Sequence, residues 1–567
     1  MNKHLSGLII GLAGLTPLLV LGETSSTLPG AGIHSWAGWK PGQISREECP
    51  ELRGVPIILK WHSLEPSPGE YQFDKFLGES LRAAIEDDLY VTVMIWVGPA
   101  VPEWIYEEGV PLVTTDRTVN ALGEPTTSQS RYPYYFAPEY RNRFFALIDA
   151  LGGYVSNLPV EWRERIVFIQ SAEGSTGDGQ PYKGNALEAQ YEISREDWND
   201  FRQATWIRYM KALSGIPILV NSDANKPEQR DWLLENMEVV GLKNGMFSHG
   251  FHVSDNRERL GQFRNTSELA RARGKPVLSR GEMDKELFVM GWSKRNVPQA
   301  LYWSGLFATH CGLDIWNVPH EALRDEANLP ALAFFNRYAG QRDPATAPEA
   351  FSALRAGLDA SDFDRFPMEA FGGKVGRKNE PERYLKIARS FADYGARVDD
   401  PIKAVGGGML NRKRSGSNDV GWGILPSNYE RFLIQLEPGS GDVGHWNIDE
   451  TIYGRFGRGF EHEAGKIRLK FKLDDAFFPD GGKPRDVVLR IVSRDEGTGY
   501  WLVNYAGRSG MTQTVRVQNT NSGDWKTHQI RLTGATFNGA LRGADLALEY
   551  GGGDDTIFHL IEIERTP

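Results

Sequence analysis

The sequence predicts a (β/α)₈ TIM barrel followed by a C-terminal antiparallel β-sandwich, and three observations lead to this prediction. From about Gly30 to Val318, a short apolar run, a polar or glycine-rich stretch and a segment of helical periodicity alternate eight times. Such a barrel takes about 250 residues before insertions, which fits this length. From about Lys403 the helical segments cease, and short alternating runs separated by glycine-rich turns are typical of antiparallel strands.

The predicted barrel strands are apolar runs that end in polar or aromatic residues. They are Gly30–Trp36, Val55–Trp61, Tyr90–Val97, Ile166–Glu173, Ile216–Asp223, Gly245–His252, Pro276–Met283 and Gly312–Pro319. Amphipathic segments between them predict helices at Phe76–Asp88, Pro138–Val155, Asp197–Leu213 and Asn265–Gly274. An open doubly wound sheet is the rival fold, but the first predicted strand is not followed by a GxGxxG turn. The alternation therefore favours the barrel.

The chain divides into three predicted parts: a signal peptide at 1–24, a barrel with a helical extension at 25–400, and a β-sandwich at 401–567 that is a candidate carbohydrate-binding domain. Lys3 and His4 precede an apolar run, Leu8–Leu21, that is too short for a comfortable membrane span and ends in small and polar residues. A membrane anchor is the alternative interpretation. The pattern predicts a secreted or periplasmic protein with no membrane span in the mature chain.

Composition excludes several classes of function. The net charge of −10 and pI near 5.7 give no electrostatic footprint for nucleic acid. Two cysteines, Cys49 and Cys311, exclude a disulfide framework and a cysteine-based zinc site; export would allow them to pair, and two buried thiols are the alternative. The sequence has no EF-hand spacing, HExxH or GxSxG motif, so we expect no metal, no cofactor and no serine triad. It does not predict the oligomeric state.

Two glutamates end predicted barrel strands, where a TIM barrel displays its catalytic groups. Glu173 ends the fourth strand and Glu282 the seventh. Paired carboxylates among aromatic rings suit glycosidic cleavage, because one protonates the leaving oxygen and the other stabilises or traps the cationic sugar ring. Candidate substrate-binding residues at neighbouring strand ends are His34, Trp36, Trp61, Trp96, Asn221, His249, His252 and Trp316.

The segment "WHSLEPSPGEYQFDKF", Trp61–Phe76, is similar to the pattern after the second strand of family 42 β-galactosidases and related barrels. With the two strand-end glutamates 109 residues apart, the chain resembles a retaining glycoside hydrolase of clan A. The resemblance implies that Glu173 is the general acid/base and Glu282 the nucleophile. Clan A enzymes usually place an asparagine before the acid/base, and Ala172 stands there instead.

Each assignment has an alternative. Asp284 and Glu286 compete with Glu282, and Glu65 is expected to hold the loop after the second strand rather than to react. Trp316 is a sugar platform or a packed core residue. The first functional hypothesis is a secreted retaining glycosidase that cleaves β-galactosidic linkages in a polysaccharide or oligosaccharide; the departure at Ala172 fits an uncommon galactan such as agar or carrageenan. The second is a non-catalytic carbohydrate-binding protein on a barrel scaffold. A polysaccharide lyase would need a base that the pattern does not place.

Overall fold

The structure is a computed structural model that describes residues 28–36, 38–117, 131–175, 179–221, 227–243, 257–283, 288, 295–355, 363–364, 366–373, 383, 386–387, 389–390, 428–508 and 510–566. The predicted signal peptide lies outside these residues. Within them, no helix is long and apolar enough to cross a membrane.

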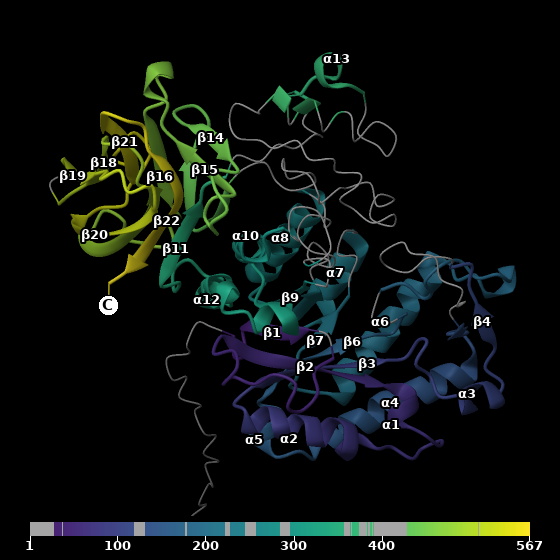
Figure 1. The fold of residues 1–567 in the computed structure, drawn as a ribbon. Helices are drawn as coiled ribbons and strands as arrows, with labels where there is room; N and C mark the ends of the chain where they lie inside the picture. The colour runs from purple at the N-terminus through teal and green to yellow at the C-terminus, as the bar shows by residue number, and fades with distance from the viewer. Residues whose placement is uncertain are drawn as a thin grey trace, which may run out of the picture.

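A closed barrel of eight parallel strands forms the N-terminal part (Figure 1). Its strand order is β1-β10-β9-β8-β7-β6-β3-β2, so each strand lies beside its neighbour in the chain's alternation. The barrel strands are β1 (Gly32–Trp36), β2 (Leu52–Lys60), β3 (Tyr90–Trp96), β6 (Ile166–Ser171), β7 (Ile218–Val220), β8 (Val240–Lys243), β9 (Val277–Glu282) and β10 (Ile315–Pro319). The predicted barrel is therefore confirmed.

The sixth strand is a correction to the sequence prediction. We expected it at Gly245–His252, but the barrel strand in this place is β8, Val240–Lys243. Residues 244–256 lie outside the described residues. β8 contains only four residues and begins soon after α7 ends at Asn236. So short a run shows no periodicity that would distinguish a strand from the end of the helix.

Helices cover the outside of the barrel. The helices of this part of the chain are α1 (Trp61–Leu64), the π-helix η1 (Asp74–Gly78), α2 (Glu79–Glu86), α3 (Trp104–Glu107), α4 (Pro138–Ser156), α5 (Val160–Arg163), α6 (Arg195–Ala212), α7 (Pro227–Asn236), α8 (Arg257–Ala272), α10 (Val297–Cys311), α11 (His320–Leu323) and α12 (Leu329–Tyr338). A further short helix, α13 (Met368–Phe371), lies away from the barrel (Figure 1). The insertion after β3 adds α3 and a hairpin of β4 (Leu112–Thr114) and β5 (Arg131–Pro133).

Local sequence fixes where α6 and α10 begin and where α10 ends. At α6 the Ser194 hydroxyl accepts a hydrogen bond from the Asp197 backbone N–H, a regular N-cap. At α10 Asn296 caps Gln299 in the same way, and Gly312 ends the helix with a left-handed φ of 77°. A side chain other than glycine would be strained at this last position.

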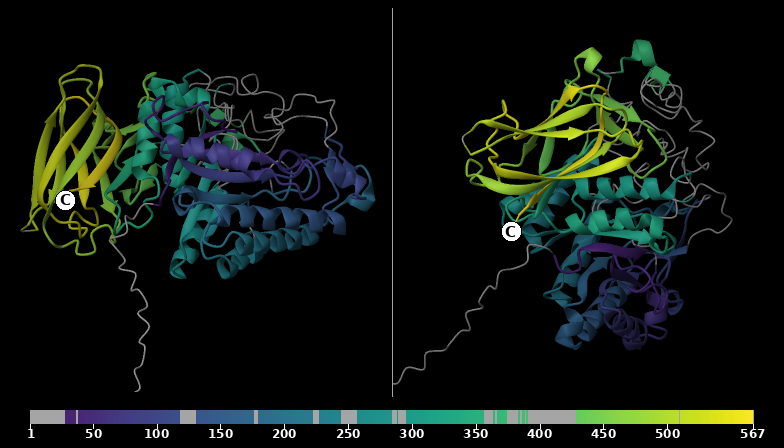
Figure 2. Two further views of the ribbon diagram at one scale, coloured as in Figure 1. Left: turned by 90° about the horizontal axis from the view of Figure 1, so that it is seen from below. Right: turned by 60° about the vertical axis from the view of Figure 1, so that its left-hand side comes forward.

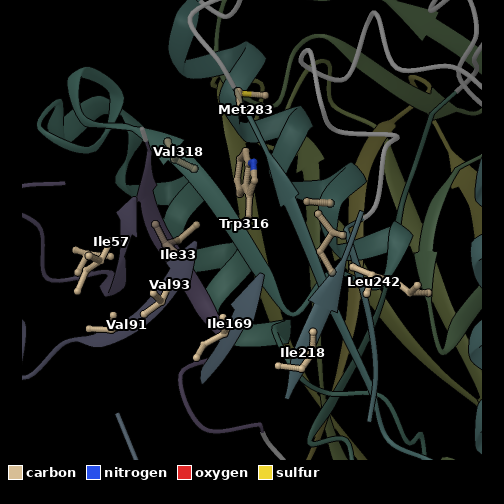
Figure 3. Close-up of a cluster of buried hydrophobic side chains, with 14 of the residues drawn as sticks. Ile33, Ile57, Val91, Val93, Ile169, Ile218, Leu242, Met283, Trp316 and Val318 are labelled. Atoms are coloured by element: carbon tan, nitrogen blue, oxygen red, sulfur yellow. The ribbon is translucent and has the colours of Figure 1, made fainter. Parts of the chain in front are cut away.

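Apolar side chains on the outward faces of the strands pack against the helices. Figure 3 shows part of this cluster, with Ile33, Trp316 and Val318 from neighbouring strands. A smaller apolar group, which includes Phe168, Leu219, Leu278 and Ile315, lies on β6, β7, β9 and β10. Leu278 shares the face of Arg280 and Glu282, because alternate residues of a strand point the same way.

The C-terminal part contains two antiparallel sheets, as predicted, and lies beside α10 and α12 (Figures 1 and 2). One sheet has seven strands: β11 (Glu349–Ala353), β12 (Tyr429–Arg431), β14 (Val443–Trp446), β15 (Phe456–Gly459), β17 (Arg485–Arg494), β20 (Trp525–Ala535) and β22 (Ile557–Arg565). The other has five: β13 (Leu433–Leu436), β16 (Arg468–Leu473), β18 (Tyr500–Ala506), β19 (Thr512–Gln518) and β21 (Leu546–Gly552).

One strand of this β-domain comes from before the predicted boundary at residue 401. β11 pairs with both β12 and β22, so the sheet takes in a segment that the sequence division placed with the barrel. The β-domain, defined from here on as β11 through β22, therefore begins close to residue 349.

Candidate functional site

A polar network centred on Arg280 fills the barrel above its apolar floor. Arg280 lies in the middle of β9 and is almost fully buried. Its Nε donates to Asn317 Oδ1 at 2.5 Å, and one terminal nitrogen donates to Gln170 Oε1 at 2.8 Å. The other terminal nitrogen donates to Glu282 Oε2 at 2.8 Å. The guanidinium thereby links β9 to β6 and β10 across the barrel interior.

Glu282 lies at the carboxyl end of β9 with a cation on each carboxylate oxygen. Besides Arg280 on Oε2, the Lys243 ammonium at the end of β8 lies 2.8 Å from Oε1. All three side chains are buried or nearly so. A buried carboxylate requires such partners, and here they also fix the direction in which it points.

Trp36 completes this site at the carboxyl end of β1. The Arg280 guanidinium carbon lies 4.4 Å from the centre of the Trp36 ring, a cation–π contact. Trp36 remains partly exposed, as does Trp96 at the end of β3. These two rings are the predicted aromatic residues that the structure leaves accessible at strand ends.

Glu173 lies in a different environment, between β6 and helix α6. One carboxylate oxygen accepts hydrogen bonds from Arg202 Nε at 2.6 Å and Trp206 Nε1 at 3.2 Å, and the other from the Ser171 hydroxyl at 2.6 Å. Glu173 is 1% exposed, and Arg202 and Trp206 both belong to α6. The carboxylate therefore faces the helix layer.

Strand alternation explains this orientation. Gln170 points into the barrel, where it meets Arg280, so Ser171 points outward and the next inward position is Ala172. Glu173 then falls on the outward side. The acid/base role of Glu173 stays a prediction, and it would require the carboxylate to leave Arg202.

Two of the predicted tryptophans pack into the helix layer. Trp61 contacts Tyr140 with ring centres 5.7 Å apart, and its Nε1 donates to Glu65 Oε2 at 2.7 Å. Trp316 is 0% exposed and lies edge-on to Phe335 at 5.5 Å. Neither ring has an exposed face for a sugar. Glu65 also accepts from the Gly69 backbone N–H and so holds its loop, as expected.

His34 is a core histidine. Its ring is fully buried, its Nε2 donates to the Gly30 carbonyl at 2.8 Å, and it lies so close to Gly54 that a Cβ there would be 2.4 Å from the ring. Burial lowers the pKa of His34 to about 4, despite the bond to Gly30, and Arg280 adds to the lowering. His34 is neutral and packed inside the barrel.

The remaining predicted site residues are placed only in part. Asn221 follows β7, and its backbone carbonyl accepts from Arg202. His249, His252, Asp284 and Glu286 lie outside the described residues. Both cysteines are free and buried, so the buried-thiol alternative is confirmed. Where the chain is described, no group of three or more potential metal ligands occurs.

Sequence reasoning missed the polar partners of Glu282. Arg280 carried a usable signal, because a charged residue two positions before a strand-end glutamate must share its face. Lys243 could not be found, since the sixth strand was placed after it. Gln170 and Asn317 are polar residues inside apolar runs, which predicts a buried hydrogen-bonding role.

Comparison with known proteins gives no family: no family model matches the chain, and no curated protein matches it. Solved structures similar to it include β-galactosidase from the psychrophilic Marinomonas ef1, at 12% identity and TM-score 0.34 over 54% of this chain and 59% of that one. The exo-β-1,4-mannosidase Op5Man5 from Opitutaceae bacterium strain TAV5 matches at 14% and 0.32, over 54% and 59%. GH5_18 from Streptomyces cattleya in complex with GlcNAc matches at 13% and 0.35, over 60% and 85%.

These matches are too distant to assign a family or an activity. The chain spans 59% of the length of the first and second of these proteins. The fold and the site together define a (β/α)₈ barrel with an ion-paired glutamate at the carboxyl end of its seventh strand.

Proposed function

We propose that this protein is a glycoside hydrolase in which Glu282 is the carboxylate that acts on the anomeric carbon. The observation that carries the proposal is the position of Glu282, at the carboxyl end of a barrel strand with Lys243 and Arg280 on its two oxygens. That end of a TIM barrel is where catalytic groups lie. Trp36, whose ring contacts Arg280 and is partly exposed, offers apolar surface for the C–H groups of a sugar.

In the proposed double displacement, one Glu282 oxygen attacks the anomeric carbon as the glycosidic bond breaks and the leaving oxygen takes a proton from the acid. Water then attacks the same carbon, gives its proton to the conjugate base, and releases Glu282 as carboxylate. Lys243 and Arg280 fix the orientation of the Glu282 carboxylate, and thereby the direction from which its oxygen attacks. Gln170 and Asn317 hold Arg280 in place throughout.

Glu173 stays the predicted acid/base, and the cost of that role is the loss of its buried bond to Arg202, since breaking such a pair costs about 3–5 kcal/mol. Contacts of the substrate with Glu173 or Arg202 would have to offset this free-energy cost.

For substrate and location we propose a β-linked galactose-containing polysaccharide or oligosaccharide, such as agar or carrageenan, and a secreted or periplasmic enzyme. These rest on the resemblance of Trp61–Phe76 and on the apolar run Leu8–Leu21.

The test is release of reducing sugar from a panel of galactans by wild type, Glu282→Gln and Glu173→Gln, with Glu161→Gln on exposed α5 as the matched control. Glu282→Gln should lose activity by orders of magnitude, and Glu161→Gln should keep it. If Glu173 is the acid, its variant should lose about 10²–10⁴-fold on natural glycosides and far less on aryl glycosides with good leaving groups. Full activity of Glu282→Gln would end the proposal.

A second candidate, a carbohydrate-binding barrel without hydrolysis, is favoured by the orientation of Glu173 toward α6. A binding protein needs no acid at this strand end. It predicts no sugar release from any substrate, but calorimetric binding of oligosaccharide that Trp36→Ala abolishes.

A further inference from the structure

The β-domain contains a cavity of about 510 Å³ at the end of its seven-stranded sheet. This volume is in the range of small-molecule sites, about 300–1,000 Å³. The cavity is lined by residues of β14, β17 and β22, by the turns that follow β15 and β17, and by the turn that precedes β22. The lining residues are Val443, His445, Phe460, Glu461, Arg494, Glu496, Gly497, Asp554, Asp555 and Ile557.

His445 lines this cavity from β14. Its Nε2 is buried and has no hydrogen-bond partner within the described residues. Burial lowers the pKa of His445 to about 4, so the ring is neutral at ordinary pH, with one nitrogen as donor and one as acceptor.

Some of the charged side chains that line the cavity already form hydrogen bonds or ion pairs within the protein. Asp555 accepts from the His462 backbone and ring, and Asp554 accepts from the Thr498 backbone N–H. Arg494 contacts Asp449 and Glu496. The Glu461 side chain forms no hydrogen bond or ion pair within the described residues, and its backbone pairs with Lys466.

This wall has four carboxylates and one guanidinium, so it is acidic in sum. It would repel sulfate or uronate groups. Carboxylates accept hydrogen bonds from hydroxyl groups, and Arg494 and His445 can donate to hydroxyl oxygens. A metal ion is disfavoured, because no three potential ligands come together in the described chain. The combination suits an uncharged ligand with many hydroxyls.

We propose that this cavity is a second carbohydrate site, which binds a neutral, unsulfated segment of a glycan by its hydroxyl groups. The site does not depend on hydrolysis in the barrel, and its test uses no catalytic step.

The cavity is also fixed to the barrel. Asp449, which contacts Arg494, accepts from Trp525 Nε1 at 2.8 Å, and its carbonyl accepts from Gln299 of α10 at 3.1 Å. Bonds between Asn296 and Glu450 add to this connection. A glycan held in the β-domain is thereby kept at a constant position relative to the barrel.

The experiment measures binding of the full chain to a neutral β-galactan and to the same polymer after chemical sulfation, by affinity electrophoresis and calorimetry. Glu461→Gln and His445→Ala are the test variants, and Glu463→Gln, exposed on the same turn, is the matched control. Trp36→Ala reports any binding at the barrel mouth separately.

The neutral polymer should slow the migration of the wild-type protein in affinity electrophoresis, and the wild type should bind the sulfated polymer more weakly. Each test variant should weaken the neutral binding about tenfold, while Glu463→Gln stays at wild type. Glu461→Gln exchanges a charged acceptor of hydroxyl groups for a weaker neutral amide, and His445→Ala removes the imidazole that lines the cavity. Equal binding by Glu461→Gln and Glu463→Gln, preference for the sulfated polymer, or no binding of the neutral one would each overturn the proposal. Thermal melting shows whether His445→Ala is folded, and the near-isosteric Glu461→Gln carries the test if it is not.

Discussion

Arg280 is the residue on which the barrel interior depends, because its guanidinium serves Glu282, Gln170, Asn317 and the Trp36 ring together. A lysine could not replace it, since one ammonium lacks the planar fork that reaches three acceptors in fixed directions. The residue therefore sets both the packing of the interior and the orientation of Glu282.

Arg280→Met should destabilise the fold by about 3–5 kcal/mol, because it removes the cation that contacts Oε2 of the buried Glu282 carboxylate. The double variant Arg280→Met/Glu282→Gln should recover part of the loss. Urea denaturation of wild type, both single variants and the double variant gives the coupling energy. Additive effects would contradict the ion pair as the cause.

Glu173→Gln should lower the free energy of unfolding by about 3–5 kcal/mol, since Arg202 would keep its charge in a buried place without a carboxylate. A carboxylate whose main role is catalytic behaves otherwise, because its removal usually leaves stability unchanged or raised. Melting of Glu173→Gln beside the surface control Glu161→Gln distinguishes the two. An unchanged melting temperature would contradict a structural role for the pair of Glu173 and Arg202 and would favour the predicted acid/base role of Glu173.

His34 should make the fold sensitive to acid. Its pKa is about 4 in the folded chain and about 6.5 when unfolded, so the unfolded state binds the proton first. Stability should be complete above about pH 6.5 and decrease toward pH 4, by roughly 1.4 kcal/mol per pH unit from this group. His445 and His559, whose pKa values burial also lowers, act with the same sign.

The measurement is the free energy of unfolding in urea between pH 7 and pH 4.5, for wild type and His34→Gln. The variant should show the smaller slope. Parallel curves would mean that His34 is already protonated in the folded chain.

The residue scale also shows what the sequence could predict. The position of Glu282 followed from its place at the end of an apolar run, and the loop-holding role of Glu65 followed in the same way. The orientation of Glu173 could not be predicted in this way. The sequence located the strand end, but it did not show which of its alternate residues point into the barrel. That register depends on Gln170 meeting Arg280 across the barrel, a contact between residues 110 positions apart.

At the scale of elements, α10 is the joint between barrel and β-domain. Every residue from Gln299 to Cys311 is buried, so the helix is covered on all sides. The Trp303 ring lies 5.0 Å from Phe456 and 5.1 Å from His559, and Tyr302 bonds His559 Nε2 at 3.0 Å. A helix that is apolar all round signals such burial in the sequence, but the sequence does not say what covers it.

Trp303→Ala should destabilise the protein by about 3–5 kcal/mol, because it opens a cavity between the two parts. Trp303→Phe, which keeps most of the ring, should cost less. Differential scanning calorimetry measures both the loss of stability and the number of unfolding transitions. Two separate transitions in Trp303→Ala, where wild type shows one, would show that α10 couples the two parts; a loss below 1 kcal/mol would mean that the ring is not packed as described.

At the scale of the whole molecule, the boundary between the two parts does not follow the change of sequence pattern. The helical pattern extends well past residue 349, yet β11 at Glu349–Ala353 is a strand between β12 and β22 of the β-domain. Five residues are too few for a periodicity that would show this. The short alternating runs that the sequence predicts after about Lys403 do form strands, and β16 shows why such runs are recognisable, because its alternate residues are buried.

A chain shortened to residues 1–400 should therefore fail to fold as a soluble monomer, although it contains every barrel strand. It would carry β11 without its partners β12 and β22, and it would expose the α10 side chains Trp303 and Phe307 that Phe456 and Tyr429 cover. Large exposed apolar patches and unpaired strand edges promote aggregation. Light scattering and binding of a hydrophobic dye, compared between the shortened and the full chain, measure this aggregation.

Adding residues 401–567 as a separate chain should restore solubility by supplying both the missing strands and the side chains that cover α10. A shortened chain that stays monomeric and melts in one cooperative transition would show that the barrel folds without the β-domain, and that the contacts of α10 serve only to join two independent parts.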